Sequence, residues 1–329
     1  LMIRRPPRST LDRASAASDV YKRQAKYLIA GWRRQWSDGG DISSGLTRYL
    51  IRKLEAKKIA EMSRTLSDIC FPFQISGTHD AYRPRASFED GLPSAPMAWD
   101  NSFYDAGNGL IIFRGDEPWY RIDLYGEAFF EALGEIGIEQ TVTIEGYNGP
   151  APPDIERRVS CVYSKENMKE NLDKFGLQYS SYGKNGGQGP TIGMALINMA
   201  HFEHPDVEIF RLGAMAPMYP FATSSNQQVG IPTDHRAFYD IMRRLKVMFN
   251  LTIDLSELKT LGDNESDKLK SSLDRIATNN SEAKDIIDKA RLDFSYTPFP
   301  ESTDINPDLD RALQDILGEQ PNSTDDPSN

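Results

Sequence analysis

The chain has 329 residues, of which 39% are hydrophobic, enough for one large α/β domain with an appendage or for two domains. Its net charge of −10 predicts a surface that repels nucleic acids and anionic membranes. No apolar run approaches the roughly 18 residues that span a bilayer. The two cysteines, Cys70 and Cys161, lie in apolar segments, so we expect buried free thiols in a reducing cytoplasm.

The first 24 residues differ in composition from the rest of the chain. They contain six basic and two acidic residues, whereas the remainder is strongly acidic. The segment resembles a basic, Ser-rich targeting arm, but it lacks the apolar core of a signal peptide. It also resembles the translated read-through of a sequencing adapter, which occurs at contig ends in metagenomic assemblies. We therefore expect a non-native leader at residues 1–24 and a native start close to Ala25.

A β-loop-α-β unit is predicted next. Short strands are expected at residues 27–30 and 57–62. Between them, apolar side chains recur with helical spacing at Ile42, Leu46, Tyr49, Leu50 and Leu54. Asp41 or Ser43 is expected to cap this helix at its N-terminus. Such a unit predicts two paired parallel strands with a right-handed crossover.

Strands and helices alternate along the middle of the predicted fold. Residues 70–96 are rich in proline and aromatic residues, and we expect an irregular segment there with one strand at 85–89. Further strands are predicted at 99–106 (an edge strand), 110–113 (a central strand), 140–146, 158–163 and 207–213, and helices at 119–136, 165–175 and 191–202. Gly137 is expected to end the first of these helices. The alternation favours an α/β fold with a mostly parallel sheet covered on both faces.

The pattern becomes helical from about Asp234 onward. Helices are expected at 236–249, 255–261, 266–278, 281–290 and 308–317, separated by glycine, asparagine and serine. The final residues are acidic and polar, and we expect them to be disordered. The predicted domains are a leader at 1–24, an α/β core at 25–232, a helical extension at 233–318 and a disordered tail at 319–329.

Three glycine-containing loops lie beside the predicted strands. Asp38-Gly39-Gly40-Asp41 follows the first strand, residues 145–150 end another, and residues 183–190 open a helix at Thr191. Loops at the carboxyl ends of strands are where α/β sheets bind ligands. The first loop is either a tight structural turn or a ligand site whose aspartates would repel phosphate, and the third is either a flexible surface loop or a close backbone approach to a ligand. The first loop lacks the spacing of a dinucleotide fingerprint, and the third lacks that of a P-loop.

The sequence predicts no metal and no cofactor. His201 and His204 are three residues apart near a helix end, but no third ligand follows from the sequence. His79 and Asp80 could form a base oriented by a carboxylate, but no nucleophile signature accompanies them. Cys161 lies on a predicted strand, where core packing is expected. No catalytic residue is therefore predicted.

Several short motifs follow one another in a specific order. They are Trp36-Ser37-Asp38-Gly39-Gly40, Phe103-Tyr104, residues 145–150, Ser160-Cys161-Val162-Tyr163-Ser164, Gly189-Pro190-Thr191-Ile192-Gly193, Ala216-Pro217-Met218-Tyr219 and residues 239–245. Together they resemble the proteasome assembly chaperone family of the second-subunit type, in its bacterial branch, over about residues 25–317. The resemblance implies a three-layer α/β/α sandwich, similar to nucleoside phosphorylases and peptidyl hydrolases, with a C-terminal helical extension. It also implies homo-oligomers such as trimers.

The first functional hypothesis is a non-catalytic protein-binding or assembly-chaperone module. Eukaryotic relatives scaffold proteasome ring assembly, while the bacterial branch is largely uncharacterised. Archaeal relatives reach the proteasome through a C-terminal hydrophobic-Tyr-X tail. Asp326-Pro327-Ser328-Asn329 does not match that tail, so we do not expect direct proteasome docking. This hypothesis expects a protein partner and an exposed apolar patch, with no binding of nucleic acid or membrane.

The second hypothesis is a small-molecule enzyme or sensor with a pocket at the carboxyl ends of the strands. The candidate ligand-binding residues are Asp38, Gly39, Gly40, Glu145, Tyr147, Asn148, Gly149, Lys184, Gly189 and Thr191. The hypothesis requires that Gly39, Gly149 and Gly189 converge around one cavity. It also expects at least one carboxyl group there with a strongly shifted pKa.

Overall fold

The computed structural model describes residues 27–33, 38–63, 70, 85–98, 100–181, 189–222 and 228–299. Five sequence predictions fall outside these described residues: the leader, the pair His79 and Asp80, Lys184, the helix at 308–317 and the tail at 319–329. The division of the chain at residues 232 and 233 stays a prediction.

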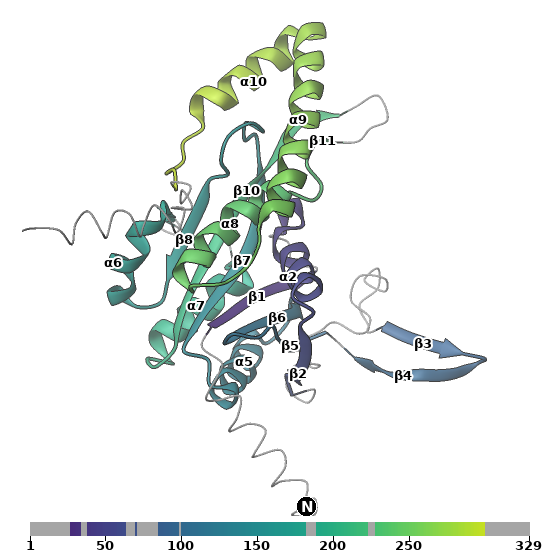
Figure 1. Cartoon of the computed structure of the whole chain (residues 1–329), viewed down its shortest axis with the longest axis vertical. Helices are drawn as coiled ribbons and strands as arrows, with labels where there is room; N and C mark the ends of the chain where they lie inside the picture. Colours follow the sequence, from purple (N-terminus) through teal and green to yellow (C-terminus); the bar gives the residue numbers. More distant parts are fainter. Residues whose placement is uncertain are drawn as a thin grey trace, which may run out of the picture. The chain divides into compact units, whose positions relative to one another are not determined.

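One sheet with the strand order β2-β5-β6-β1-β7-β10-β8-β9 forms the centre of the fold, and β11 pairs with β10 (Figure 1). The strands are β1 (Tyr27–Arg33), β2 (Lys57–Glu61), β5 (Ser102–Asp105), β6 (Leu110–Asp116), β7 (Gln140–Gly149), β8 (Val159–Tyr163), β9 (Gln178–Tyr179), β10 (Glu208–Ala222) and β11 (Gln228–Gly230). The central strands β6, β1, β7 and β10 are parallel, whereas β5 and β8 run antiparallel to them. The fold is therefore α/β with a mostly parallel central sheet.

Helices cover both faces of this sheet. They are α2 (Ile42–Lys53), α5 (Ile122–Ile136), α7 (Ile192–Phe202) and α8 (His235–Met248). On one face, Phe129 of α5 and Leu196 of α7 share a buried cluster with Ile111 of β6. On the other face, α2 packs so closely on β1 that a Cβ at Gly31 would lie 2.4 Å from a backbone oxygen of α2. Because both faces are covered, the central strands are continuous buried apolar runs.

An aromatic cluster fills the core between the sheet and α5. Trp32, Phe103, Phe113 and Phe129 contact one another with ring centroids 4.8–6.2 Å apart. The indole Nε1 of Trp32 donates a hydrogen bond of 2.9 Å to the Tyr125 hydroxyl. Burying these rings removes a large apolar area from water, and the hydrogen bond satisfies the polar atom that the indole carries inside.

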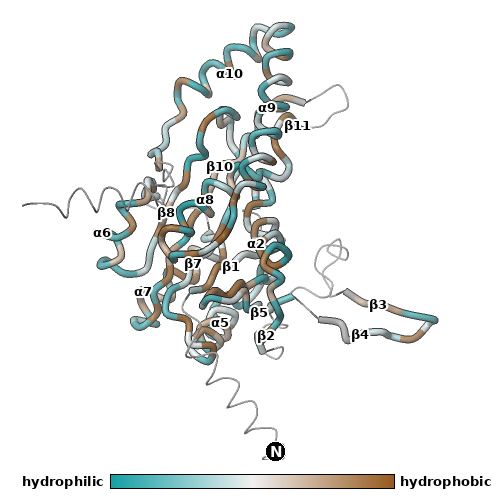
Figure 2. Tube along the Cα trace, in the orientation of Figure 1, coloured by the Kyte–Doolittle hydropathy of each residue, from teal (hydrophilic) through white to brown (hydrophobic). Residues whose placement is uncertain are grey.

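Two further helices, α9 (Ser256–Asn279) and α10 (Ser281–Asp293), extend the fold beyond α8. Leu269 and Leu273 of α9 and Ala290 of α10 form a small core with Tyr219 and Ile231, next to the extended end of β10. Figure 2 shows hydrophobic residues gathered along the central strands, and mainly hydrophilic residues along α9 and α10. The extension is therefore amphipathic and buries a narrow apolar stripe.

A buried group of charged residues joins α8 to the segment before β8. Arg157 and Asp234 are both fully buried, with the Arg157 Nε atom 2.8 Å from an Asp234 oxygen. Asp240 of α8 accepts a hydrogen bond of 2.8 Å from the Arg157 amide, and Arg244 pairs with Glu156. Burial raises the pKa of Asp240 and lowers that of Arg244. Removing one partner of such a pair leaves a buried charge uncompensated, so the group fixes α8 against the sheet.

Most of the predicted elements are confirmed, with shifted ends. The strand at 140–146 continues to Gly149, and the strand at 207–213 continues to Ala222. Helix α5 ends at Gly137, whose φ of 85° is the left-handed conformation that a glycine C-cap adopts. Helix α7 begins after Thr191, whose hydroxyl oxygen accepts the Met194 amide at 3.3 Å. The helix ends at Gly137 and Thr191 depend on residues within one turn, so they can be predicted from the sequence.

Two predictions about strand neighbours are wrong. β1 and β2 do not pair: β1 lies between β6 and β7, and within the described sheet β2 pairs only with β5, in antiparallel register. The predicted edge strand β5 is interior, because β2 lies outside it. In the sheet, the β5–β6 hairpin lies between β1 and β2. The sequence between β1 and β2 gives no sign of this insertion, because β5 and β6 come later in the chain.

Two local predictions about helices are also wrong. The two helices expected at 255–261 and 266–278 are the single helix α9, because Gly262 allows α9 to approach the α8 backbone: a Cβ there would lie 2.6 Å from the Arg236 nitrogen. The helix at 165–175 divides into short turns at Glu166–Met168, Lys169–Leu172 and Asp173–Phe175. The strand expected at 85–89 is confirmed as β3, and it pairs with a strand that was not predicted, β4 (Leu92–Ala98). Asp41 is the N-cap residue of α2, but its side chain makes no capping hydrogen bond.

Candidate functional site: a cavity at the strand ends

A cavity of about 540 Å³ lies where the central parallel strands end. Its lining comes from the loop after β1, the end of β7, the start of the antiparallel strand β8, the end of β9, the start of α7 and β10. The carboxyl edge of a parallel sheet is the usual ligand site of α/β folds, because the loops there diverge from the strands. The cavity is therefore the candidate functional site.

The Asp38-Gly39-Gly40-Asp41 loop packs directly on β7. Asp38 forms a parallel bridge with Gly146, and a Cβ at Gly146 would lie only 2.0 Å from the Gly39 carbonyl oxygen. Gly40 has a φ of 63°, a left-handed conformation that favours glycine. The close approach therefore requires these glycines, and it brings Gly39 to the cavity wall.

The Asp38 carboxylate turns away from the cavity and caps α2. It accepts hydrogen bonds from the Ser43 amide at 2.7 Å, the Ser44 amide at 3.2 Å and the Ser44 hydroxyl at 2.7 Å. Burial raises its pKa to about 6, since the loss of hydration outweighs these hydrogen bonds and the nearby Asp41 carboxylate adds to the increase. Neither aspartate belongs to the cavity lining, so the repulsion of anions that the sequence suggested does not arise from these side chains.

A buried ion pair forms the floor of the cavity. The Arg211 Nε atom of β10 lies 2.6 Å from a carboxylate oxygen of Glu145 on β7, and Arg211 Nη1 donates to the Ser160 hydroxyl at 3.0 Å. The other Glu145 oxygen accepts the Gly193 amide of α7 at 3.1 Å. Both side chains are almost entirely buried, with 5% of Arg211 and none of Glu145 exposed.

The strand register explains how this pair forms. Gly213 of β10 is opposite Glu145 of β7 on one side and Ser160 of β8 on the other. A Cβ at Gly213 would lie 2.4 Å from Arg211 Nη2, so the guanidinium group occupies the space that glycine leaves free. Arg211 therefore lies across Gly213 and reaches the strand neighbours on both sides.

A second arginine borders the cavity. Arg158 donates from Nε to the Tyr147 hydroxyl at 3.3 Å, and its guanidinium carbon lies 5.9 Å from the Tyr147 ring centroid and 5.8 Å from that of Phe294. Contacts with aromatic faces orient a guanidinium group without neutralising its charge. Neither Arg158 nor Arg211 was among the sequence-predicted candidates.

The cavity brings together only some of the predicted residues. Gly39, Tyr147, Asn148 and Thr191 line it. Glu145 lies beneath it, Asp38 faces α2 and Gly40 packs against Ala216 and Asp234. Gly149 packs beside Met215, and Gly189 is exposed, so the expected convergence of Gly39, Gly149 and Gly189 around this cavity is wrong. Their ligand-binding roles stay predictions, and Lys184 lies outside the described residues.

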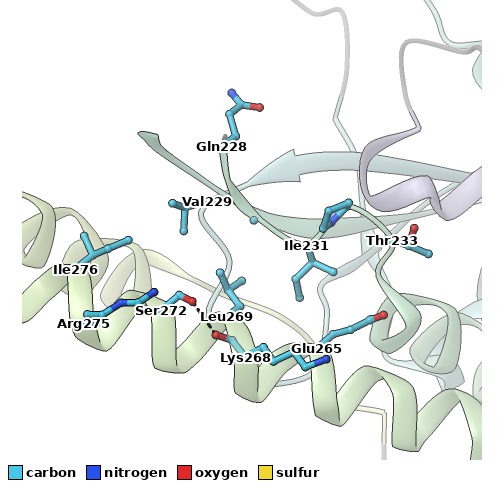
Figure 3. A pocket seen from close by; sticks show the side chains of 12 residues that line it. Gln228, Val229, Ile231, Thr233, Glu265, Lys268, Leu269, Ser272, Arg275 and Ile276 are labelled. Atoms are coloured by element: carbon cyan, nitrogen blue, oxygen red, sulfur yellow. Dashed lines mark hydrogen bonds between the residues drawn. The ribbon is translucent and has the colours of Figure 1, made fainter. Parts of the chain in front are cut away.

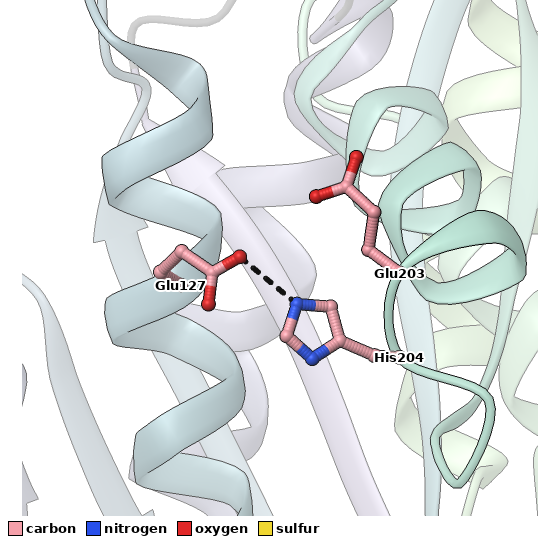
Figure 4. A group of neighbouring side chains, drawn as sticks. All are labelled: Glu127, Glu203 and His204. Carbon is pink, nitrogen blue, oxygen red and sulfur yellow. Dashed lines mark hydrogen bonds and ion pairs between the residues drawn. The ribbon is translucent and has the colours of Figure 1, made fainter.

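A separate group of potential metal ligands lies between α5 and the end of α7. Glu127, Glu203 and His204 have ligand atoms within 4.8 Å of one another (Figure 4). His204 Nε2 lies 3.0 Å from a Glu127 oxygen, and the imidazole packs 4.4 Å from the Phe130 ring. His201 is not part of this group, because its Nδ1 atom lies 2.7 Å from the Ser164 carbonyl oxygen. In the structure, His204 and Glu127 form a hydrogen-bonded pair that ties α7 to α5.

A second cavity, of about 830 Å³, lies between β11 and α9 (Figure 3). Val229, Ile231, Leu269 and Ile276 form its apolar wall, and three of these residues belong to the small core under the helical extension. Glu265 on its rim pairs with His235 at 2.6 Å. None of the predicted candidate residues lines this cavity.

Comparisons with known proteins decide the family. The sequence matches the PAC2 family over residues 34–276. The chain belongs to the PAC2 family. A comparison with curated protein sequences found no match. Among the described helices, none is both long enough and apolar enough to cross a membrane.

Solved structures of PAC2-type proteins share the fold. A PAC2 family protein from Streptomyces avermitilis has a TM-score of 0.59 and 20% identity, with 79% of this chain and 99% of that chain covered. A proteasome-assembly chaperone homologue of Mycobacterium tuberculosis has a TM-score of 0.58 and 16% identity, covering 74% and 94%. An archaeal proteasome activator of Pyrococcus furiosus, PbaB, has a TM-score of 0.51 and 17% identity, covering 76% and 93%. At these identities the likeness extends to the fold alone.

Proposed function

We propose that this chain is a non-catalytic, protein-binding module of the assembly-chaperone type, which works as a homo-oligomer in the cytoplasm. Membership of the PAC2 family supports the proposal, and relatives of the same fold carry the names proteasome-assembly chaperone homologue and proteasome activator. Both cysteines are buried free thiols, which suits a reducing compartment.

The observation that carries the proposal is a hairpin with exposed apolar side chains. β3 (Arg85–Glu89) and β4 (Leu92–Ala98) pair only with each other among the described strands. Asp90 and Gly91 both have positive φ, at 49° and 82°, as a two-residue hairpin turn requires. Every residue from 86 to 95 is exposed, and Phe88 and Leu92 are 67% and 72% exposed.

Such a hairpin favours docking to another protein. A two-stranded hairpin without packing against further structure is only marginally stable in water. Phe88 is opposite Pro93 and Leu92 is opposite Glu89, so the two large apolar side chains are exposed on opposite faces of the hairpin. We therefore assign Phe88 and Leu92 to the contact with a partner or with another copy of the chain.

The enzyme alternative loses its main premise in the structure. It required three glycine loops around one cavity, and of Gly39, Gly149 and Gly189 only Gly39 lines the strand-end cavity. The one candidate carboxyl group whose pKa is clearly raised, that of Asp38, is engaged with the amides of α2. No catalytic role is therefore proposed for this site.

The double variant Phe88→Glu/Leu92→Glu tests the proposal. The matched control is Ser87→Glu/Ser94→Glu, which adds the same charge to the same hairpin at exposed polar positions. Light scattering gives the oligomeric mass of the chain alone.

The wild type and the serine control are expected to oligomerise, whereas the Phe88/Leu92 variant is expected to be monomeric and to keep its fold. The proposal is wrong if the wild type is monomeric. It is equally wrong if the Phe88/Leu92 variant behaves as the wild type does.

A further inference from the structure

The strand-end cavity has a charge opposite to that of the chain. The whole chain carries a net charge of −10, yet the described lining of the cavity includes Arg158 and Arg211 and no aspartate or glutamate. A cleft lined by charges of one sign concentrates ligands of the other sign. The only carboxylate bound to these arginines in the described part of the chain is Glu145, beneath Arg211.

We propose that this cavity binds a small organic anion, with its carboxylate or phosphate group placed between Arg158 and Arg211. Arg211 uses Nε for Glu145 and Nη1 for Ser160. Among the described residues, its Nη2 atom has no hydrogen-bond partner. A guanidinium group has five N–H donors, and a donor held at the wall of a cavity favours an anionic acceptor.

Arg158 supplies the excess positive charge. Glu145 neutralises Arg211, whereas the contacts of Arg158 are the Tyr147 hydroxyl, the Met215 sulfur and two aromatic rings. None of these contacts carries a negative charge. The pair of arginines with Glu145 therefore keeps a net charge of about +1, which one anionic group would neutralise.

Helix α7 adds to the attraction for an anion. The helix starts at the cavity, with Thr191 and Met194 in the lining, and it runs for 11 residues. The N-terminus of a helix carries a partial positive charge from its aligned peptide dipoles. Glu145 already accepts the Gly193 amide and the Thr191 hydroxyl accepts the Met194 amide, so this contribution is small and the arginines carry the assignment.

The remaining wall fits the organic part of such a ligand. Tyr147, Tyr179 and Met194 supply rings and an apolar side chain beside the polar groups. The volume of about 540 Å³ lies within the range of small-molecule sites. The ligand class is therefore a carboxylate or phosphate attached to a compact ring. This inference does not depend on the hairpin or on the proposed protein partner.

Isothermal titration calorimetry with the full chain tests the proposal using matched probes. Phenyl phosphate and benzoate carry the two anionic groups on the same ring, and benzyl alcohol is the neutral comparison. Inorganic phosphate shows whether the ring contributes. We expect both aromatic anions to bind at least tenfold more tightly than benzyl alcohol, and the better of the two identifies the group.

Two variants locate the binding. Arg158→Gln removes the uncompensated charge, and we expect it to weaken both anions by about ten- to a hundredfold with little effect on benzyl alcohol. The double variant Glu145→Gln/Arg211→Gln replaces the buried ion pair by a neutral pair and is expected to weaken them too. Arg52→Gln, on an exposed position of α2, is the control with the same charge change and should bind as the wild type does.

Each outcome decides the proposal. Tighter binding of the anions that is lost in Arg158→Gln supports it. Absence of anion binding in the wild type overturns it, and so does binding that Arg158→Gln and Arg52→Gln weaken equally. If the double variant does not fold, the single Arg158 variant still gives the answer, since its side chain is partly exposed at the cavity wall.

Discussion

The strand-end cavity and the β3–β4 hairpin are both candidate binding regions, but they are built in opposite ways. The floor of the cavity is made of polar groups on adjacent strands, and Glu145, Arg211 and Ser160 are held there by buried hydrogen bonds. In the hairpin, every residue from 86 to 95 is exposed, including the large apolar residues Phe88 and Leu92. Substitutions at the cavity should therefore alter the stability of the whole fold, whereas substitutions on the hairpin should alter association only.

The largest expected effect is that of Arg211→Met. The variant leaves the Glu145 carboxylate buried without its arginine, which destabilises a protein by about 3–5 kcal/mol. Leu92→Glu, on the hairpin, should change stability by less than about 0.5 kcal/mol. Urea unfolding of the two variants measures the contrast. Equal losses of stability would show that the two regions do not differ as described.

The second prediction concerns pH and Asp38. Its pKa is about 6 in the folded chain against an ordinary value of 3.8, so its protonated form stabilises the fold below about pH 4, and this contribution is lost as the pH rises through 6. Asp38→Asn keeps an acceptor for the α2 amides and cannot titrate.

Unfolding experiments from pH 4 to pH 7 compare the two proteins. The wild type should lose up to about 3 kcal/mol relative to Asp38→Asn over this range. Parallel pH profiles would mean that the Asp38 carboxyl group is not desolvated by the loop, and that the loop is less tightly closed than the structure indicates.

The smallest effect on stability is expected at Gly146, where the 38–41 loop packs on β7. Gly146→Ala places a Cβ 2.0 Å from the Gly39 carbonyl oxygen, and forcing the loop away from β7 should cost about 1–3 kcal/mol. Gly134→Ala on the exposed side of α5 meets no atom within 4 Å and should stabilise the helix by up to about 1 kcal/mol. Thermal unfolding distinguishes them, and a neutral Gly146→Ala would contradict the close contact.

Local signals in the sequence predicted much of the fold. The β-branched run at 141–144 gave a buried strand, Thr191 gave a helix start and Gly137 gave a helix end. These features depend on neighbours within a few residues. Strand order depends on distant segments, which is why the antiparallel placement of β2 beside β5 was not foreseen.

The candidate site was predicted in part for the same reason. The glycine loops indicated the edge of the sheet, and Gly39 and Thr191 do line the cavity. Arg211 and Ser160 become neighbours only through the register of β10 and β8 around Gly213. An arginine inside the apolar run from Ile209 to Leu212 was the available signal for a buried partner.

The hairpin was missed although its turn signal is present. Asp90-Gly91 is a favoured two-residue turn, and it separates β3 from β4. Proline and polar residues in β4 obscured the alternation that a strand usually shows. The exposure of Phe88 and Leu92 is a tertiary property, and it became visible only in the structure.

Amide hydrogen exchange of the free and the assembled chain is the most direct test of docking through the hairpin. In the free chain, amides in β3 and β4 should exchange rapidly, and those in β7 and β10 slowly, because the central strands are buried. Assembly, with another copy or with a partner, should protect β3 and β4 while leaving β7 and β10 unchanged. Hairpin amides that exchange equally fast before and after assembly would contradict the account.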